Sequence, residues 1–390
     1  MVVTKLIRHL CLFTALLANS VLTSFVLVNQ AQAAVLPEDR ADILYHRYEG
    51  GGMTIDGPAV LVRKSVSEKV SLSGYYYADA VSAASIDVVT TASPYTEDRD
   101  EYRFGVDYLH GKSTMSLSYS NSDESDYTAN TLSFGVSQDM FGDLTTVALG
   151  FAYGWDEVGK NGEPEFDEEI DRYSYSFGLT QVLTANWIAA FNLQAITDEG
   201  FLNNPYRSVR FVDPTVPSGY SYQPEVYPET RTSVAGSITS KYYLPYRAAL
   251  GFEARYFDDD WDIQAYNVGV DYTHPIGNEW VLTTRVRYYS QSEAEFYSDL
   301  FPYRDAQNFM ARDKELSDFT SITVGIGATY KLPLDDYTER FTGSATIEWD
   351  HIEFDYNNFR DARETDAVAG EESLYSFSAD VVRAFVSFYY

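Results

Sequence analysis

The stretch Ile322-Thr-Val-Gly-Ile-Gly-Ala-Thr-Tyr330 decides the fold class, because apolar residues alternate in it with small or polar ones. Residues two apart point to the same face of a β-strand, so this pattern predicts a strand with one apolar face. The same period of two recurs over residues 101–108, 131–137, 172–180 and 250–256. Helical periodicity is hard to find after Pro37. The fold class is therefore all-β.

A soluble β-sandwich also alternates, so the choice between sandwich and membrane barrel needs further features. The chain holds 33 Tyr and 23 Phe, and these gather on the apolar faces, as the aromatic girdles of a transmembrane barrel require. The segments run to about ten residues, the length of a tilted membrane-spanning strand. Short and long connections alternate along the chain. These features favour a single antiparallel transmembrane β-barrel.

Sixteen strands are predicted, and fourteen or eighteen would also satisfy the pattern. An even number places both chain ends on the periplasmic side. The predicted strands are 41–48, 57–65, 70–79, 100–109, 113–121, 127–138, 144–156, 171–182, 187–197, 230–243, 247–257, 261–273, 280–292, 317–331, 341–355 and 373–390.

The connections fall into two classes, as in outer-membrane barrels with short periplasmic turns and long external loops. Seven carry turn chemistry, among them His110-Gly-Lys112, Pro275-Ile-Gly-Asn278 and Pro333-Leu-Asp-Asp336. The alternate connections would face outward. Two of them are short, and the longer ones are 49–56, 80–99, 157–170, 198–229, 293–316 and 356–372.

Composition and charge exclude several functions. The net charge is −30, from 58 acidic and 28 basic residues, so binding to a phosphate backbone is disfavoured and no nucleic-acid partner is expected. The single cysteine, Cys11, lies in the segment that we expect to be removed on export. Disulfides and thiolate metal sites are then excluded, and no cofactor is indicated.

Residues 1–33 have the features of a cleaved signal peptide. Lys5 and Arg8 precede a mostly apolar stretch from Leu10 to Val28, and Ala31-Gln-Ala33 offers a small-x-small cleavage site. The alternative is a single membrane anchor, but no stop-transfer charges follow directly. The sequence thus predicts a signal peptide over 1–33 and a barrel over 34–390.

The final strand has a sequence feature that indicates where the protein is located. Val382, Ala384, Val386, Phe388 and the terminal Tyr390 form one apolar row. A chain that ends on an aromatic residue in an alternating strand resembles the signal that outer-membrane proteins present to their insertion machinery. We therefore expect an outer-membrane location and a contact of this strand with that machinery.

Several motifs resemble a family of exported Gram-negative barrels that has no assigned function. They are Arg40-Ala-Asp-Ile-Leu-Tyr-His-Arg-Tyr-Glu-Gly-Gly-Gly52, Ile86-Asp-Val-Val-Thr-Thr-Ala-Ser-Pro-Tyr95, Thr197-Asp-Glu-Gly-Phe-Leu-Asn-Asn-Pro-Tyr-Arg207, Pro224-Glu-Val-Tyr-Pro228 and Tyr242-Tyr-Leu-Pro-Tyr-Arg247. The resemblance covers the whole mature chain. It implies a barrel in the outer membrane, supplies no catalytic residues, and points to exported redox proteins as neighbours of some relatives.

The row that alternates with the apolar one must face the lumen, and it carries charge. Its arginines are candidates for the pore lining, because opposed rows of arginine and acid create a field that filters ions. The alternative is that these groups only pair with one another. The candidates are Arg103, Asp107, Arg172, Glu253, Arg255, Arg285 and Arg287, with Glu101, Glu348, Asp350 and Arg383 in the same rows.

The longest predicted loop, 198–229, is the candidate for a constriction folded into the lumen. It contains Asn203-Asn-Pro-Tyr-Arg207 and then Arg210. Pro-Tyr-Arg occurs here at 205–207 and again in a predicted loop at 302–304, where it would place guanidinium groups against tyrosine rings. Arg207 and Arg210 therefore join the candidate constriction residues. The alternative is a flap on the outer surface.

Acidic residues concentrate in the predicted outer loops, over residues 156–169, 258–262 and 361–372. Hard divalent cations prefer such oxygen ligands, so these loops would be bridged to lipopolysaccharide by Ca²⁺ or Mg²⁺. No EF-hand or aspartate-glycine repeat is present, so a dedicated metal site is not predicted.

No enzymatic motif occurs. Gly-x-Ser-x-Gly, His-Glu-x-x-His and a Walker loop are all missing from the sequence. The leading hypothesis is a passive or weakly selective channel for small polar or ionic solutes. A second is a barrel that sheaths an exported partner, for which a redox protein is a candidate. The third and weakest is a membrane hydrolase that uses His351, the histidine flanked by several acids.

Overall fold

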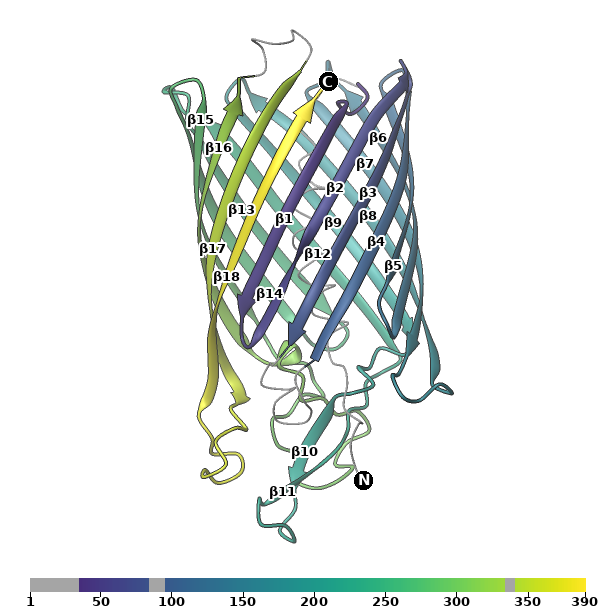
Figure 1. Cartoon of the computed structure of the whole chain (residues 1–390), viewed down its shortest axis with the longest axis vertical. Coiled ribbons are helices and arrows are strands. Elements are labelled where there is room, and N and C mark those ends of the chain that lie inside the picture. The colour runs from purple at the N-terminus through teal and green to yellow at the C-terminus, as the bar shows by residue number, and fades with distance from the viewer. Residues whose placement is uncertain (1–34, 84–94, 334–340) are drawn as a thin grey trace.

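The structure is a computed structural model, and it describes residues 35–83, 95–333 and 341–390. Within these residues the chain forms a closed antiparallel barrel of sixteen strands (Figure 1). The predicted signal peptide, most of the motif at 86–95 and most of the turn at 333–336 lie outside the described residues. The barrel strands are β1 (Arg40–Gly50), β2 (Met53–Ser67), β3 (Val70–Ala83), β4 (Tyr95–His110), β5 (Ser113–Asp123), β6 (Tyr127–Met140), β7 (Thr145–Gly159), β8 (Asp167–Thr184), β9 (Trp187–Gly200), β12 (Thr230–Tyr243), β13 (Ala249–Asp259), β14 (Gln264–Ile276), β15 (Trp280–Gln291), β16 (Phe319–Leu332), β17 (Thr342–Arg360) and β18 (Leu374–Tyr389).

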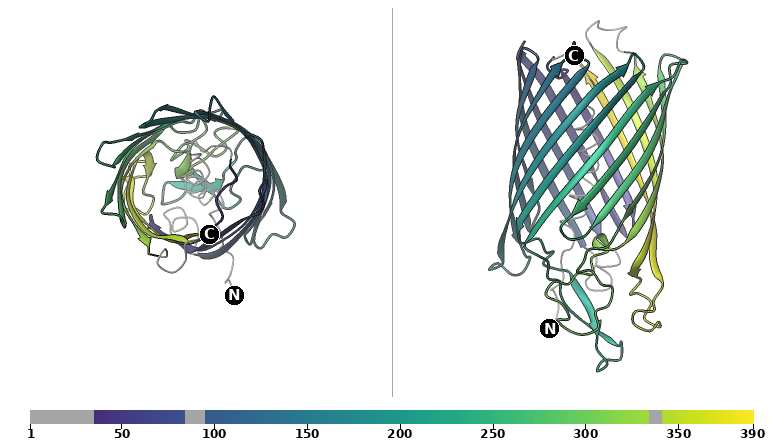
Figure 2. Two further views of the ribbon diagram at one scale, coloured as in Figure 1. Left: turned by 90° about the horizontal axis from the view of Figure 1, so that it is seen from above. Right: turned by 180° about the vertical axis from the view of Figure 1, so that it is seen from behind.

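The barrel closes because β1 pairs with β18 as well as with β2. The β1–β18 register runs from Arg40 opposite Tyr389 to Gly50 opposite Ala379. Every barrel strand therefore has two neighbours, which satisfies the backbone groups without free edges, as a hydrocarbon environment demands. Seen along its axis, the barrel is a complete ring (Figure 2).

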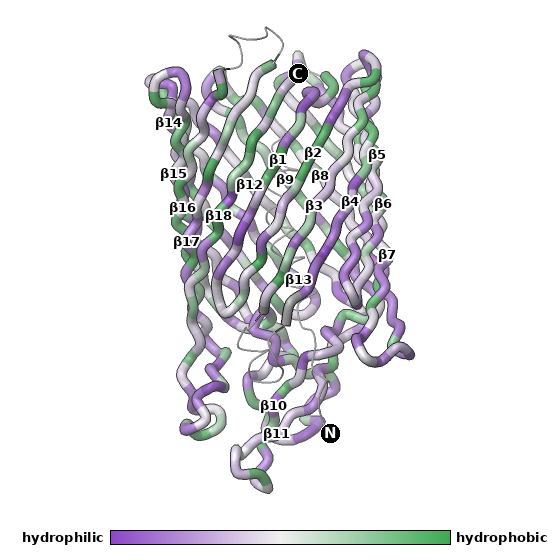
Figure 3. The backbone as a smooth tube through the Cα atoms, viewed as in Figure 1, coloured by the Kyte–Doolittle hydropathy of each residue, from purple (hydrophilic) through white to green (hydrophobic). Residues whose placement is uncertain are grey.

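The outer face of the barrel is apolar. Phe104, Leu149 and Ile347 are 64%, 61% and 57% exposed, so more than half of each residue is free of protein contact and suits contact with lipid. Apolar and polar residues alternate along the strands (Figure 3). Since cross-strand partners share a face, the polar rows that alternate with the exposed apolar ones line the inside.

All sixteen predicted strands are present, but the prediction of a long loop over 49–56 is wrong. The connection between β1 and β2 consists of Gly51 and Gly52, with φ of 58° and 81°. The strands continue further than predicted because Tyr48, Met53 and Ile55 pack together on the inner side. Glycine takes such positive φ angles at no steric cost, which permits the tight turn.

The described residues include no helix that is long and apolar enough to span a membrane.

Three long connections gather at one end of the barrel, and we call them the mouth cap: residues 201–229, 292–318 and 361–373. The first contains a small hairpin, β10 (Ser208–Val212) and β11 (Tyr220–Pro224), and the second contains the 3-10 turn η1 (Lys314–Leu316). The hairpin lies beyond the end of the barrel, and in the axial view it crosses the middle of the ring (Figures 1 and 2). The opposite end carries short turns.

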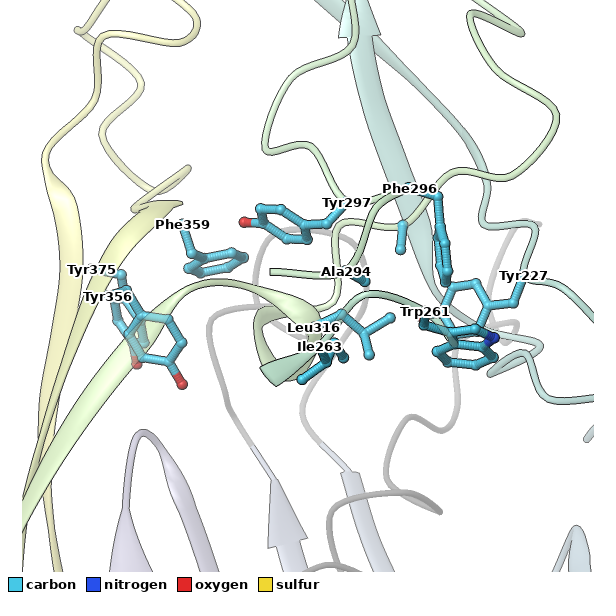
Figure 4. Packing of buried hydrophobic residues seen from close by; sticks show 11 residues of the cluster. Tyr227, Trp261, Ile263, Ala294, Phe296, Tyr297, Leu316, Tyr356, Phe359 and Tyr375 are labelled. Carbon is cyan, nitrogen blue, oxygen red and sulfur yellow. The ribbon is translucent and has the colours of Figure 1, made fainter. Parts of the chain in front are cut away.

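An aromatic core holds the mouth cap to the barrel strands (Figure 4). Tyr227 meets Trp261 and Phe296 with ring centroids 5.6 and 5.5 Å apart. Phe359, near the end of β17, is 0% exposed. The buried members of this cluster are Tyr227, Trp261, Ile263, Ala294, Phe296, Tyr297, Ala311, Leu316, Tyr356, Phe359 and Tyr375.

Candidate functional site: the lumen wall and the mouth cap

One side of the lumen wall carries a four-membered ion cluster across β15, β17 and β18. Arg285 Nε and Nη2 each lie 2.6 Å from an oxygen of Asp350. Arg383 Nη2 lies 2.7 Å from Asp350 and 3.0 Å from Glu348. The cluster fits because β16 has Gly325 between the partners: an added Cβ there would lie 2.0 Å from Asp350 Oδ1 and 2.7 Å from Arg285 Nε.

A second charged group lies on β1, β3 and β4. Arg103 donates to Glu101 at 2.8 Å, and Glu101 also accepts from Arg99 at 3.3 Å. Nearby, His46 Nε2 lies 2.6 Å from Asp79 Oδ1. The His46 ring also stacks on Tyr77 with centroids 5.1 Å apart.

Further pairs lie near the mouth cap. Arg172 donates to Asp198 at 2.5 Å, and Arg231 donates to Asp259 at 2.5 and 2.8 Å. The register places these residues on the inner face, because Arg172 is opposite Asp198 and Asp198 is opposite Arg231.

The remaining predicted lumen residues face inward without close partners of opposite charge. In the described part of the chain, Asp107, Glu253, Arg255 and Arg287 make no ion pair within 4.0 Å. Asp107 lies opposite Ser71 and Ser116.

The wall formed by β5 to β9 has a different chemistry. Over its middle part, away from the Arg172–Asp198 pair near the mouth cap, it presents mainly hydroxyl and amide side chains over glycines and alanines, so this part is polar and uncharged. A Cβ added to Gly135 would lie 2.6 Å from Ser116 Oγ, so glycine makes room for the hydroxyl opposite it. The inner rows here include Ser116, Ser118, Ser120, Thr131, Ser133, Ser137, Ser174, Ser176, Asn192 and Gln194.

The prediction that Arg207 and Arg210 line a constriction inside the lumen is wrong, because both are buried in the mouth cap. Arg210 is 0% exposed and Arg207 7%. Arg210 donates to Glu372 at 2.5 and 3.0 Å, to the Asp299 carbonyl at 2.9 Å, and to the Asp299 carboxylate. Arg210 also lies 5.3 Å from the centre of the Tyr220 ring, a guanidinium–tyrosine contact at an arginine outside the Pro-Tyr-Arg motif.

Arg210 thereby joins all three connections of the mouth cap. Asp299 belongs to 292–318 and Glu372 to 361–373, and Asp299 also accepts from Arg312 at 3.1 Å. Burial opposes the charge on Arg210, but its hydrogen bonds to Glu372 and Asp299 outweigh burial and raise the pKa of its guanidinium. The result is a buried ionic network in which each charge has a partner.

A buried carboxylate, Glu225, sits at the junction of the first two connections. Its oxygens accept from the Tyr227 hydroxyl at 2.6 Å and from the Arg312 backbone N–H at 2.7 Å. Burial, together with the nearby charge of Asp313, raises the pKa of Glu225 to about 7.

We expect the mouth cap to loosen as the pH rises from 5 to 8. Because the pKa of Glu225 in the folded protein lies above its ordinary value of 4.5, its stabilising contribution is complete below pH 4.5 and is lost as the pH rises through about 7. Limited proteolysis within 201–229 measures this opening. In Glu225→Gln the rate should be nearly independent of pH over this range, and an unchanged slope in that variant would refute the assignment.

The predicted acidic outer clusters need correction at three positions. Asp156 is 3% exposed and accepts from Tyr127 at 2.5 Å inside the barrel. Asp259 is bonded to Arg231, and Glu372 to Arg210. These acids are therefore internal partners of hydrogen-bond donors and do not belong to a solvated rim. No group of three or more metal-ligating side chains is present in the described residues.

His351 does not point into the lumen. It pairs in register with Val324, which is 50% exposed on the outer face. Its Nδ1 lies 3.0 Å from Asp380, which also accepts from the Trp349 indole at 3.0 Å. His351 is thus a paired residue of the outer surface.

The closed barrel, its apolar outer face and its polar inner face define the class: a transmembrane β-barrel of the outer membrane. The chain matches the model of a protein family of unknown function, DUF3570, over residues 86–344. It belongs to this family. A search of curated protein sequences found no match.

Solved structures of outer-membrane proteins are similar to this chain at low identity and low TM-score. A bacterial polysaccharide outer membrane secretin is 6% identical, with 90% of this chain and 99% of that chain covered, at a TM-score of 0.46. CdiB from Acinetobacter baumannii is 8% identical, with 88% and 60% covered, at 0.46. OmpT, an outer membrane protein of Vibrio cholerae, is 11% identical, with 92% and 100% covered, at 0.39. At this level no role passes from these proteins to this chain.

Sequence reasoning missed most of the mouth cap. Asp299, Arg312 and Glu225 lie in segments without periodicity, so no pattern indicated which of them are buried. The one available signal was the pair of arginines in an otherwise acidic chain, and it did not identify their partners.

Proposed function

We propose that this protein is a passive, weakly selective outer-membrane channel for small polar or ionic solutes. One observation supports it above the others: the inner face of a sixteen-strand barrel carries charged and hydroxyl side chains where a filled core would carry apolar ones. A barrel of this size is too wide for its side chains to fill, so its interior holds water or an inserted segment.

The two walls suggest how selectivity would arise. Ion clusters on β15–β18 and β3–β4 set up local fields, whereas the middle part of the β5–β9 wall offers neutral hydrogen-bonding groups. The charged side would orient a solute, and the hydroxyl side would form hydrogen bonds with it as it diffuses through the lumen.

Planar-bilayer recording of protein purified from outer membranes tests this proposal. We expect stepwise current at fixed voltage, with a reversal potential in a salt gradient that reports the preferred ion sign. Folding of the same sample is checked by its heat-modifiable mobility in gels. If protein that is shown to be folded carries no current, the channel function is refuted.

The mouth cap favours a second candidate function, a barrel that sheaths an exported partner. A mouth covered by a buried ionic and aromatic network would pass little solute at rest, and a partner inside the barrel would need such retention. A stoichiometric protein that co-purifies with the barrel would support this function, and a conducting barrel without any partner would refute it.

The outer face also supports a proposed contact with lipopolysaccharide. Tyr45 donates to Asp56 and Tyr76 to Asp100, each at 2.6 Å, so outward carboxylates adjoin the aromatic girdle. Divalent cations would bridge such carboxylates to lipid phosphates. We likewise propose that β18, which ends the apolar row at Tyr390, contacts the insertion machinery.

A further inference from the structure

Three arginines of the lumen wall differ from the others: Arg63 on β2, and Arg255 and Arg287, which lie near each other. Arg103, Arg172, Arg285 and Arg383 each have a carboxylate partner. Arg255 and Arg287 have no carboxylate oxygen within 4.0 Å among the described residues. A charge on a barrel wall that no carboxylate contacts directly has to be solvated by water or by a ligand.

The strand register places Arg255 and Arg287 near each other, in neighbouring inward rows of the wall. Arg255 on β13 lies opposite Asn267 on β14, which lies opposite Tyr289 on β15. In the next inward row, Arg287 on β15 lies opposite Gly269 on β14. Gly269 has no side chain to separate the rows, and the two guanidinium groups are close enough to repel each other. Glu253, two residues before Arg255 on β13, attracts Arg255 and offsets this repulsion in part, but no carboxylate oxygen comes within 4.0 Å of either arginine among the described residues.

Asn267, between the two arginines, supplies an independent observation. It is 8% exposed, and its side-chain Oδ1 is buried without a hydrogen-bond partner in the described structure. A buried polar group without a hydrogen-bond partner is unfavourable, so a ligand that provides one is favoured there. The two ends of an asparagine amide are interchangeable by rotation, so this side chain can present N–H donors as readily as its oxygen.

We propose that Arg255, Arg287 and Asn267 form a binding site for an oxyanion group, a carboxylate or a phosphate, on a small solute in the lumen. Two guanidinium groups and an amide provide only donors toward such a group, and the guanidinium fork matches a pair of oxygens. Bound there, the anion offsets the repulsion between the arginines and gives the buried amide a partner. The inference names a solute class for the proposed channel, but the binding itself does not require conduction.

Glu253 limits the affinity. It lies on the inner face opposite Gly269, across from Arg287, and it has no cation within 4.0 Å among the described residues. Its charge repels an anion at the site, so binding should be weak and quickly reversible. A site along a diffusion path needs this property, since a tightly held solute would block the path.

Binding is tested on the full barrel in detergent at low ionic strength. The probes are inorganic phosphate, followed by phosphorus NMR line broadening, and acetate, followed by saturation-transfer NMR. We expect each of Arg255→Gln and Arg287→Gln to weaken binding at least threefold, and the double variant at least tenfold. Asn267→Leu should weaken it without any change in charge.

Lys241→Gln is the matched control. Lys241 lies on the inner face of the adjacent strand β12 and has Asp271 as a partner at 3.9 Å, so this variant removes one positive charge outside the site. Its binding should stay within twofold of the unmodified protein. Heat-modifiable mobility shows whether each variant has folded.

The outcomes separate this site from the channel. Loss of binding in the double variant but not in Lys241→Gln supports the site even where bilayers show no current. Equal binding by the double variant and the unmodified protein overturns it, as does the failure of both probes to bind to folded protein that conducts. A response to only one probe identifies that group as the ligand.

Discussion

Arg210→Met is expected to open the mouth cap while leaving the barrel intact. The substitution leaves the carboxylates of Asp299 and Glu372 buried without their shared cation, and breaking a buried ion pair in this way costs about 3 kcal/mol. At about 1.4 kcal/mol per tenfold change, proteolysis within 201–229 should become about 100-fold faster. If the protein conducts, the current through one molecule should also rise.

Arg304→Met is the matched control for this experiment. Arg304 lies in the same connection as Asp299, but its side chain is 72% exposed and its one ion pair, with Asp305, spans 3.8 Å. Its proteolysis should match that of the unmodified protein. Adding Asp299→Asn and Glu372→Gln to Arg210→Met should restore part of the resistance. If Arg210→Met is cleaved no faster than the control, the cap does not depend on this arginine.

Gly325→Ala is expected to destabilise the barrel itself. The new methyl carbon would lie 2.0 Å from Asp350 Oδ1 and 2.7 Å from Arg285 Nε, so the side chains must move and the four-membered ion cluster must break. Because the cluster is only partly buried, the expected loss is about 1–3 kcal/mol in the free energy of unfolding. Urea titration followed by tryptophan fluorescence measures it.

Gly236→Ala separates this effect from a general effect of glycine in strands. Gly236 lies in β12, and a Cβ added there would have no atom within 4 Å. Alanine should be neutral or slightly stabilising at this position, because it lowers the entropy of the unfolded chain. Equal urea midpoints for the two variants would show that the ion cluster does not depend on the space at Gly325.

The strands could be predicted because their signal is local and repeated. A strand with lipid on one side and the lumen on the other must alternate between apolar and polar residues. The strands at 317–331 and 100–109 can therefore be predicted from their own sequence, without knowledge of the strands that pair with them. The error at 49–56 has the same origin. The sequence predicts a loop over 49–56, whereas Tyr48 and Met53 extend the buried inner row to the turn itself.

The mouth cap could not be predicted because its determinants are not local. Arg210 meets Glu372, which is 162 positions away, and no periodicity connects the two residues. The sequence predicted a functional loop with two arginines, and it also predicted that guanidinium groups would meet tyrosine rings. The sequence does not indicate which acidic residues neutralise these arginines, and it predicts that Glu372 belongs to a solvated acidic cluster.

The pairing of β1 with β18 also determines the order of events in biogenesis. The first and last barrel strands must meet, so the ring cannot close until the whole chain has been delivered to the membrane. Until then the sheet has two free edges, which readily recruit other strands and lead to aggregation. Joining ends so distant along the chain is also slow. The seam between Arg40 and Tyr389 is therefore the last strand pairing that can form, and both edges stay unpaired until it does.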